Sequence, residues 1–265
     1  MADFHLYLAY FLALFIGISL GLTGGGGSIL TVPVLVYAAR IEPVIATAYS
    51  LFIVGTTSLF GAGSYFKKGM VNAKMGVIFA IPAFITVWLM RKFVIHAIPD
   101  QMLQIGSFTL TKNLFLMLFF SVIMLISGCK MVCGFQKEAE VKDINYKLVV
   151  LSGIVVGILS GMVGAGGGFL IVPALVFFMS LPMHKAVGTS LLIIAINSLI
   201  GFTGDIINLK YIDWEFLVIF TAIASVGVFG GIYLNKFLNS DKLKKVFGYF
   251  VLIMAVIIII KELIW

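Results

Sequence analysis

Two stretches of this chain carry one glycine-rich pattern, "GLTGGGGSILTVPVLV" at residues 21–36 and "GMVGAGGGFLIVPALV" at residues 161–176. A shift of 140 residues aligns them without a gap and superposes four glycines as well as Pro33 on Pro173. The same shift also aligns two pairs of serines, Ser50 with Ser190 and Ser58 with Ser198. Shared apolar composition does not place glycines, a proline and serines in one frame. The chain therefore contains two homologous halves.

The composition places both halves in a membrane. The chain has 265 residues, of which 62% are hydrophobic and 11% charged, whereas soluble domains carry about 25% charged residues. Because about 20 apolar residues span a bilayer as a helix, we expect an all-α polytopic membrane protein with about 8–10 membrane helical segments. Ten apolar stretches occur, at 5–22, 28–39, 44–65, 74–91, 112–132, 147–162, 168–180, 185–206, 214–235 and 243–261.

Two of these stretches, 28–39 and 168–180, are too short to span alone, and each follows a glycine-rich break. If each short stretch turns back on the helix before it as a hairpin, each half crosses the membrane an odd number of times and the two halves are inverted. If the short stretch and the helix before it together make one interrupted crossing, each half crosses four times and the halves are parallel. The hairpin model puts twelve Lys and Arg on one side and six on the other, whereas the broken-crossing model gives nine and nine. The positive-inside rule therefore predicts inverted repeats, each with a Gly-rich interrupted helix hairpin. We expect a multi-pass protein of the cell (inner) membrane with both termini on the outer side.

The most polar part of the chain divides it near the middle. We expect a first transmembrane repeat at 1–133, a cytoplasmic connector at 134–146 and a second transmembrane repeat at 147–265. The stretch 93–111 is less apolar than its neighbours, and we expect a loop there with room for a short interfacial helix.

The glycine runs are not nucleotide loops. Neither is followed by the Lys and Ser or Thr of a P-loop, and an apolar helix precedes each run instead of the strand of a dinucleotide-binding unit. Close packing of helices explains Gly17 with Gly21 and Gly157 with Gly161. Contiguous glycines instead unwind a helix, and irregular backbone at membrane depth persists only where it is buried or lines a cavity. The sequence is compatible with two roles for each glycine run: a tight turn alone, or a turn that also binds a substrate.

The apolar segments carry almost no charged side chains away from their ends, so a substrate site must use backbone groups and hydroxyls. Each glycine run precedes a short helix, whose unpaired first N–H groups attract an anion. Small polar residues also follow helical spacing on two helices, either as interhelical glue or as the lining of a path: Thr47, Ser50, Thr57, Ser58 and Gly61, and Ser190, Asn197, Ser198 and Gly201. The candidate substrate-binding residues are Gly24, Gly25, Gly26, Gly27, Ser28, Gly164, Gly166, Gly167, Gly168, Ser50, Thr57, Ser190 and Asn197. Asp205 is either a coupling residue or an interfacial loop acid.

The paired segments, each with a following Val-Pro, resemble the TauE/SafE family, also called the toluene sulfonate uptake permeases. The stretches "ATAYSLFIVGTTSLFGAG" (46–63) and "AVGTSLLIIAINSLIGF" (186–202) fit the same family, and the resemblance covers about residues 5–262. It implies a membrane permease for sulfite, thiosulfate or organosulfonate anions, often acting as an exporter. The sequence departs at Ala165, which stands where the first half has Gly25.

We therefore expect a permease in the lipid bilayer whose partner is a small anionic sulfur compound, acting by export or facilitated flow. We expect no cofactor, no metal and no nucleic acid. The alternatives are a non-transporting membrane scaffold or assembly subunit and a membrane-embedded enzyme, although no His, Cys, Asp and Glu constellation suggests catalysis. The sequence leaves open whether the protein forms a homo-oligomer.

Overall fold

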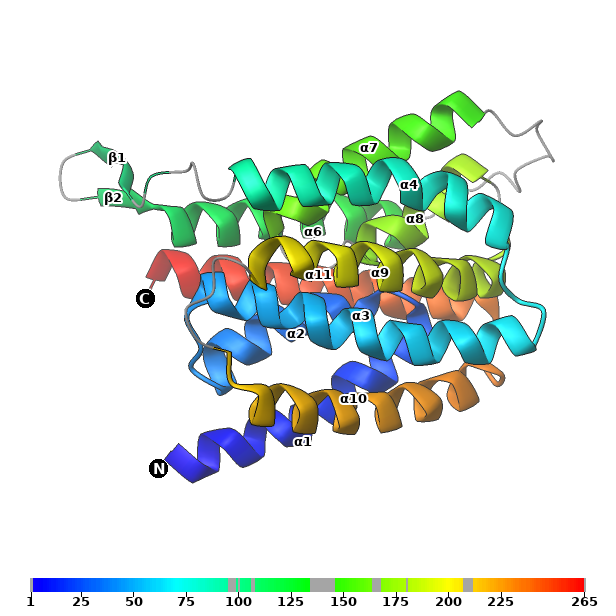
Figure 1. Ribbon diagram of the computed structural model, residues 1–265, viewed down its shortest axis with the longest axis horizontal. Coiled ribbons are helices and arrows are strands. Elements are labelled where there is room, and N and C mark those ends of the chain that lie inside the picture. Colours follow the sequence, from blue (N-terminus) through cyan, green and yellow to red (C-terminus); the bar gives the residue numbers. More distant parts are fainter. Residues whose placement is uncertain are drawn as a thin grey trace.

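The computed structural model describes residues 2–94, 99, 101–105, 108–133, 146–163, 168–179, 181–206 and 212–264. The first half contains α1 (Ala2–Thr23), α2 (Gly26–Pro33), the π-helix η1 (Val34–Ala38), α3 (Pro43–Lys67), α4 (Ala73–Leu89), the π-helix η2 (Met90–Val94) and α6 (Lys112–Val132). The second half contains α7 (Tyr146–Val163), α8 (Gly168–Met179), α9 (Met183–Ile206), α10 (Trp214–Asn235) and α11 (Ser240–Ile264). Each of the ten expected apolar stretches corresponds to a helix, and the chain is an all-α polytopic membrane protein (Figure 1). Of the expected connector, 134–145 lies outside the described residues, and Tyr146 already belongs to α7.

The stretch 93–111 differs from the expectation. Strands β1 (Gln101–Ile105) and β2 (Phe108–Thr111) pair there as an antiparallel hairpin. A loop or interfacial helix is therefore wrong for 101–105 and 108–111, because the aromatic and β-branched sequence FTLT of β2 favours a strand, whereas 95–98 lie outside the described residues. Thr111 then begins α6, since its Oγ1 accepts a hydrogen bond from the Leu114 N–H at 3.3 Å.

Five helices in the described part of the chain are long and apolar enough to cross a membrane, at 5–23, 43–67, 73–94, 183–206 and 214–235. The most apolar windows of α3 and α9 are 67% and 72% buried, whereas the other three are 33% to 44% buried. Large apolar side chains face outward on the less buried helices, among them Phe11 on α1 and Val226 on α10. Such an apolar exterior suits lipid, so this is a multi-pass membrane protein.

The main contacts between helices have counterparts between the helices that align with them in the repeat. Helix α1 packs on α10, and its counterpart α7 packs on α4, while α3 packs on α9, α6 on α11 and α2 on α8. An added Cβ on Gly55 would meet Leu199 and one on Gly61 would meet Leu191. The corresponding helices α3 and α9 therefore run antiparallel. This is the geometry that inverted repeats require, and inversion across the bilayer stays our prediction.

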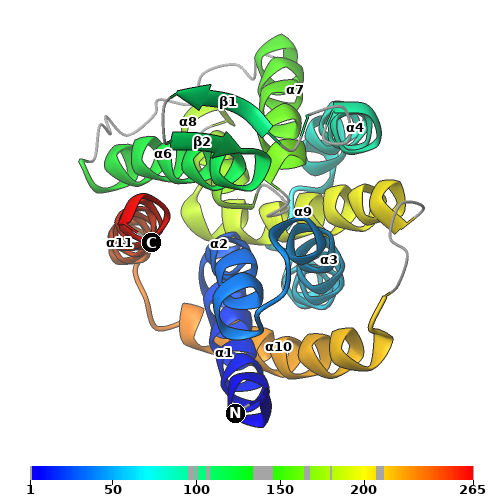
Figure 2. The same cartoon turned by 90° about the vertical axis from the view of Figure 1, so that its left-hand side faces the viewer.

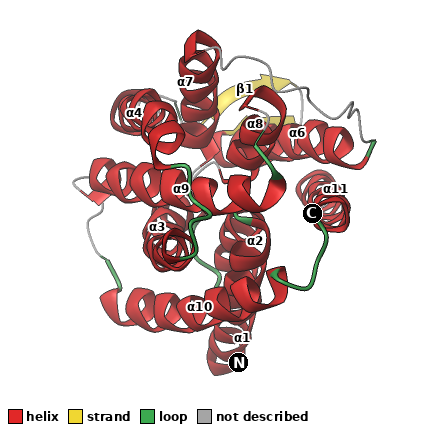
Figure 3. Ribbon diagram, turned by 90° about the vertical axis from the view of Figure 1, so that its right-hand side faces the viewer, coloured by secondary structure: helices red, strands yellow, loops and turns green. Residues whose placement is uncertain are grey.

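The helix ends separate into two groups. The ends of α3 and α10 and the starts of α4, α7, α9 and α11 gather at one end of the molecule, and both termini lie at the other (Figure 1). The first group, which we call the basic end, carries Lys67, Lys68, Lys74, Lys147, Lys185, Lys236, Lys242 and Lys245. Figure 3 looks onto the basic end and Figure 2 onto the opposite end. In both views α2 lies near the centre, with α3 beside it, and α9 runs across the molecule from the middle to one edge.

Close packing of α1 on α10 depends on glycine. A Cβ on Gly17 would overlap the Ala224 carbonyl oxygen, and one on Gly21 would overlap that of Val228. Gly227 approaches the Leu14 carbonyl in the same way from α10. These contacts agree with the expectation that small residues let the two backbones touch.

We predict that Gly17→Ala lowers the free energy of unfolding by about 1–3 kcal/mol, because the added methyl group forces α1 away from α10. The matched control is Gly63→Ala on α3, where an added Cβ meets no atom of the described residues within 4 Å. Thermal unfolding in detergent would measure both variants. Equal melting temperatures for the two would contradict the close packing.

Candidate functional site

The first glycine run breaks the chain between α1 and α2. Gly24 has φ +74°, a left-handed conformation that favours glycine, and α2 begins two residues later at Gly26. The Thr23 Oγ1 accepts a hydrogen bond from the Gly26 N–H at 2.8 Å. The Ser28 hydroxyl donates to the Gly25 carbonyl at 2.7 Å. Two donors that we expected to face an anion, the Gly26 N–H and the Ser28 hydroxyl, are therefore engaged within the loop.

Other helices satisfy the carbonyl groups at the end of α1. The last carbonyls of a helix have no partner within it, and leaving them unpaired in a buried site is costly. Two side chains donate to carbonyls of the last turn: Tyr65 Oη on α3 to Gly21 O at 3.0 Å and Asn235 Nδ2 on α10 to Leu22 O at 2.5 Å. Just after the helix, Ser190 Oγ on α9 lies 2.8 Å from Gly24 O and also 2.8 Å from Val187 O in its own helix. The break in α1 is therefore fixed by α3, α9 and α10 together.

The starts of the two short helices meet. A Cβ added to Gly168, the first residue of α8, would lie 3.0 Å from Ser28 Oγ and 3.1 Å from Gly25 Cα. The structure thus brings the first glycine run against the start of α8. The remaining candidates of the second run, Gly164, Gly166 and Gly167, lie outside the described residues.

One face of α9 contacts both helix starts. A Cβ on Gly24 would lie 2.7 Å from Val187 Cα and 2.5 Å from Ser190 Oγ. One on Gly168 would lie 2.6 Å from Ile194 Cδ1. Positions 187, 190 and 194 follow the helical repeat, and the next position on the same face is Asn197.

Asn197 is buried, with 0% of its surface exposed. Neither its Nδ2 nor its Oδ1 has a hydrogen-bond partner among the residues that the structure describes. An unsatisfied buried polar group costs about 1–3 kcal/mol, so such a group calls for an explanation. A ligand that accepts a hydrogen bond from Nδ2 would supply one.

The candidates on α3 differ from their counterparts on α9. Thr57 aligns with Asn197, but its hydroxyl donates within the helix to the Ile53 carbonyl at 2.6 Å. Ser50 aligns with Ser190, and its Oγ is buried without a hydrogen-bond partner in the described part of the chain. Thr57 therefore acts as a helix-internal hydroxyl in this structure, and Ser50 and Asn197 keep unused donors.

Four further buried hydroxyls have no hydrogen-bond partner within the described ranges and were not among the candidates: Ser58, Ser160, Ser198 and Thr221. Two of these, Ser58 and Ser198, aligned with each other in the repeat. Both belong to the polar stripes of their helices, expected either as interhelical glue or as the lining of a path, but they are not among the expected binding residues. Ser160 lies on α7 shortly before the second glycine run, where the sequence alone gave no reason to choose it.

Asp205 lies in the last turn of α9 and is 5% exposed. It is thus a buried helical acid, and the alternative of a loop acid is wrong. Eight residues separate it from Asn197, about 12 Å along a helix. Among the described residues, no group of three His, Cys, Asp or Glu side chains could hold a metal ion.

Comparison with known proteins gives one family. The family model described as "Sulfite exporter TauE/SafE" matches residues 9–258. A "Probable membrane transporter protein" of Xylella fastidiosa (strain 9a5c) is 31% identical over 257 residues, covering 92% of this chain and 91% of the relative. The "Probable membrane transporter protein YunE" of Bacillus subtilis is 28% identical over 228 residues, covering 79% of this chain and 80% of the relative.

We predict that Gly24→Ala destabilises the protein more than Gly69→Ala, by about 1–3 kcal/mol. Both glycines have positive φ, at +74° and +66°, so an alanine is strained at either position. Only at Gly24 would the new methyl group also meet Ser190 and Val187, since Gly69 has open space around it in the described structure. Denaturant unfolding in mixed micelles would measure the difference. Equal losses would show that the loop is not held tightly against α9.

Proposed function

Because the chain belongs to the TauE/SafE family of membrane transporters, we propose that it is a permease for a small sulfur-containing anion such as sulfite, thiosulfate or an organosulfonate. The site lies where the starts of α2 and α8 meet the face of α9. Its residues are those of the first run, Gly24 to Gly27 with Ser28, together with Gly168, Ser50, Ser190 and Asn197. The buried amide of Asn197, which has no hydrogen-bond partner among the described residues, is the observation that supports this proposal most directly.

The chemistry of the site suits an oxyanion. The oxygens of a sulfur oxyanion accept hydrogen bonds, and an asparagine Nδ2 and a serine hydroxyl donate them. Two helix starts also add positive dipole ends in the same place. Glycine at Gly168 lets the start of α8 lie against Gly25 and Ser28, because a Cβ there would meet both residues.

Energetics favour a hydrated site with modest affinity. A helix start contributes about 0.3–2 kcal/mol to an anion, whereas full desolvation of an isolated charge costs tens of kcal/mol. Two helix starts and a few donors do not offset that loss. The anion therefore keeps part of its water, which favours flux over retention.

The membrane potential favours export. Each charge gains about 2.3 kcal/mol per 100 mV, so a dianion gains about 4.6 kcal/mol on leaving a negative-inside cell. That corresponds to a gradient on the order of a thousandfold without a coupling ion. Asp205 is the one buried acid in the described part of α9, and we propose that export proceeds without it as a coupling group.

Anion flux in proteoliposomes under an imposed potential tests the proposal. We expect flux of at least one of sulfite, thiosulfate and a small sulfonate, and at least a tenfold loss in Asn197→Leu. Replacing an unsatisfied buried amide with an apolar group of similar size should leave stability unchanged or higher. The matched control is Thr221→Val on α10, which also removes a buried unpartnered group and should keep normal flux.

Two results would overturn the proposal. Absence of flux for all three anions in the wild-type protein would favour the scaffold or assembly subunit. Full flux in Asn197→Leu would place the site elsewhere.

Asp205→Asn tests the absence of coupling. We expect potential-driven efflux to stay within about twofold of wild type, because a dianion needs no proton to leave the cell. Efflux would be measured with and without a proton gradient. Proton-dependent uptake that disappears in Asp205→Asn would contradict uncoupled export.

A further inference from the structure

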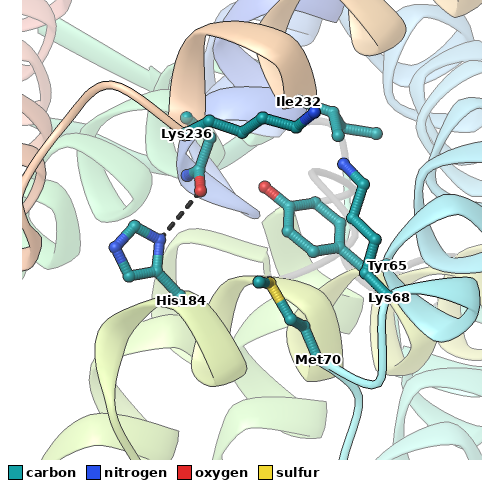
Figure 4. A pocket seen from close by; sticks show the side chains of 7 residues that line it. Tyr65, Lys68, Met70, His184, Ile232 and Lys236 are labelled. Carbon is teal, nitrogen blue, oxygen red and sulfur yellow. Dashed lines mark hydrogen bonds between the residues drawn. The ribbon is translucent and has the colours of Figure 1, made fainter.

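A hollow opens at the basic end, between α3, α9 and α10. It has a volume of about 270 Å³, and its lining includes Tyr65, Lys68, His184, Asn235 and Lys236. Figure 4 shows the side chains of Lys68 and Lys236 converging beside Ile232, above the ring of Tyr65. An adjoining hollow of about 340 Å³ shares both lysines. We call the first hollow the basic vestibule.

The charges of the vestibule all have one sign. None of the residues that line either hollow is acidic in the described structure. Lys68 Nζ lies 5.5 Å from the ring centroid of Tyr65, and Lys236 Nζ lies 5.7 Å from that of Tyr233. Burial, and after it the positive charge of Lys236, lower the pKa of Lys68. Both ammonium groups line the same hollow (Figure 4), and an anion between them would relieve their repulsion.

The vestibule adjoins the glycine break. Tyr65 and Asn235, which line it, donate to the carbonyls of Gly21 and Leu22 in the last turn of α1. His184 Nδ1 lies 2.8 Å from Asn235 Oδ1, an interaction that holds the amide with its Nδ2 toward α1. Two residues of the vestibule wall are therefore bonded to the last turn of α1, which leads into Gly24.

We propose that the basic vestibule is a capture site for the oxyanion, on the side that the positive-inside rule assigns to the cytoplasm. This inference rests on the proposed function, since it names the place where the exported anion first binds. A cleft lined by one sign of charge raises the local concentration and association rate of the opposite charge by about 10–10³-fold, and added salt screens the effect. Lys68 and Lys236 supply the field, and the Asn235 and Tyr65 donors lead toward the glycine runs.

Direct binding of radiolabelled thiosulfate to the purified full chain in neutral detergent tests the proposal. We expect Lys68→Gln/Lys236→Gln to raise Kd at least tenfold at low ionic strength and to flatten its dependence on salt. The variant Lys68→Arg/Lys236→Arg keeps both charges, and its Kd should lie within threefold of the wild-type value. Such a result would show that the weaker binding of the Gln variant is not a folding defect. The matched control is Lys185→Gln/Lys245→Gln, which removes two exposed charges at the same end but outside the vestibule and should bind as wild type. Equal Kd values for the two Gln double variants would overturn the proposal.

Flux separates this proposal from the proposed function. In phosphatidylcholine vesicles, the vestibule variant should need at least a tenfold higher thiosulfate concentration for half-maximal flux, with a maximal rate near wild type. An unchanged half-maximal concentration would overturn the vestibule while leaving the permease in place. Absence of flux in the wild-type protein would overturn the permease, and the binding assay would still decide the vestibule.

A lipid phosphate shares the chemistry of the oxyanion, so one arm adds phosphatidylglycerol to the binding assay. Retention of thiosulfate binding at the vestibule with phosphatidylglycerol present supports the capture site. Complete displacement, together with unchanged flux in the Gln variant, would show a lipid headgroup site and overturn the proposal.

Discussion

The structure depends on how the protein satisfies the backbone where α1 ends at the first glycine run. A helix end leaves carbonyl groups without partners in the helix, and each buried one that stays unpaired costs about 1–3 kcal/mol. Tyr65 of α3 and Asn235 of α10 bond two of these carbonyls, and Ser190 of α9 bonds the Gly24 carbonyl just after the helix. The break is therefore possible only when all three helices are in place, which ties the glycine run to the assembled bundle.

The same constraint explains why glycine is required on the helices that surround the break. A side chain donor reaches a backbone carbonyl only when the two helices approach closely. Gly17 and Gly21 let α1 lie against α10, and Gly24 lets the loop lie against Val187 of α9. Close helix packing and hydrogen bonding of the backbone carbonyls thus depend on each other. A glycine run can therefore serve both as a tight turn and as part of a binding site.

The sequence predicts the helices and the first glycine break well, because glycine, proline and long apolar runs act locally. It predicts the site only in part. A stripe of hydroxyls is the same in sequence whether each one donates to its own helix, as Thr57 does, or faces a ligand, as Ser50 can. The pairing of Lys68 with Lys236 depends on the packing of α3 against α10, which periodicity does not reveal. The hairpin of β1 and β2 was missed because a short amphipathic segment gives no strong helical or strand period.

The capping of α1 also bears on which charge can enter. Uncapped carbonyls at a helix C-terminus carry partial negative charge and attract cations. Here the Gly21 and Leu22 carbonyls accept from Tyr65 and Asn235, so their lone pairs are already engaged. On the route that we propose, an anion meets the two ammonium groups of the vestibule first and then the glycine break, whose carbonyls are already bonded to Tyr65 and Asn235. The hydrogen bonds that make the break stable thus also weaken the attraction of these carbonyls for a cation, which agrees with the anion permease that we propose.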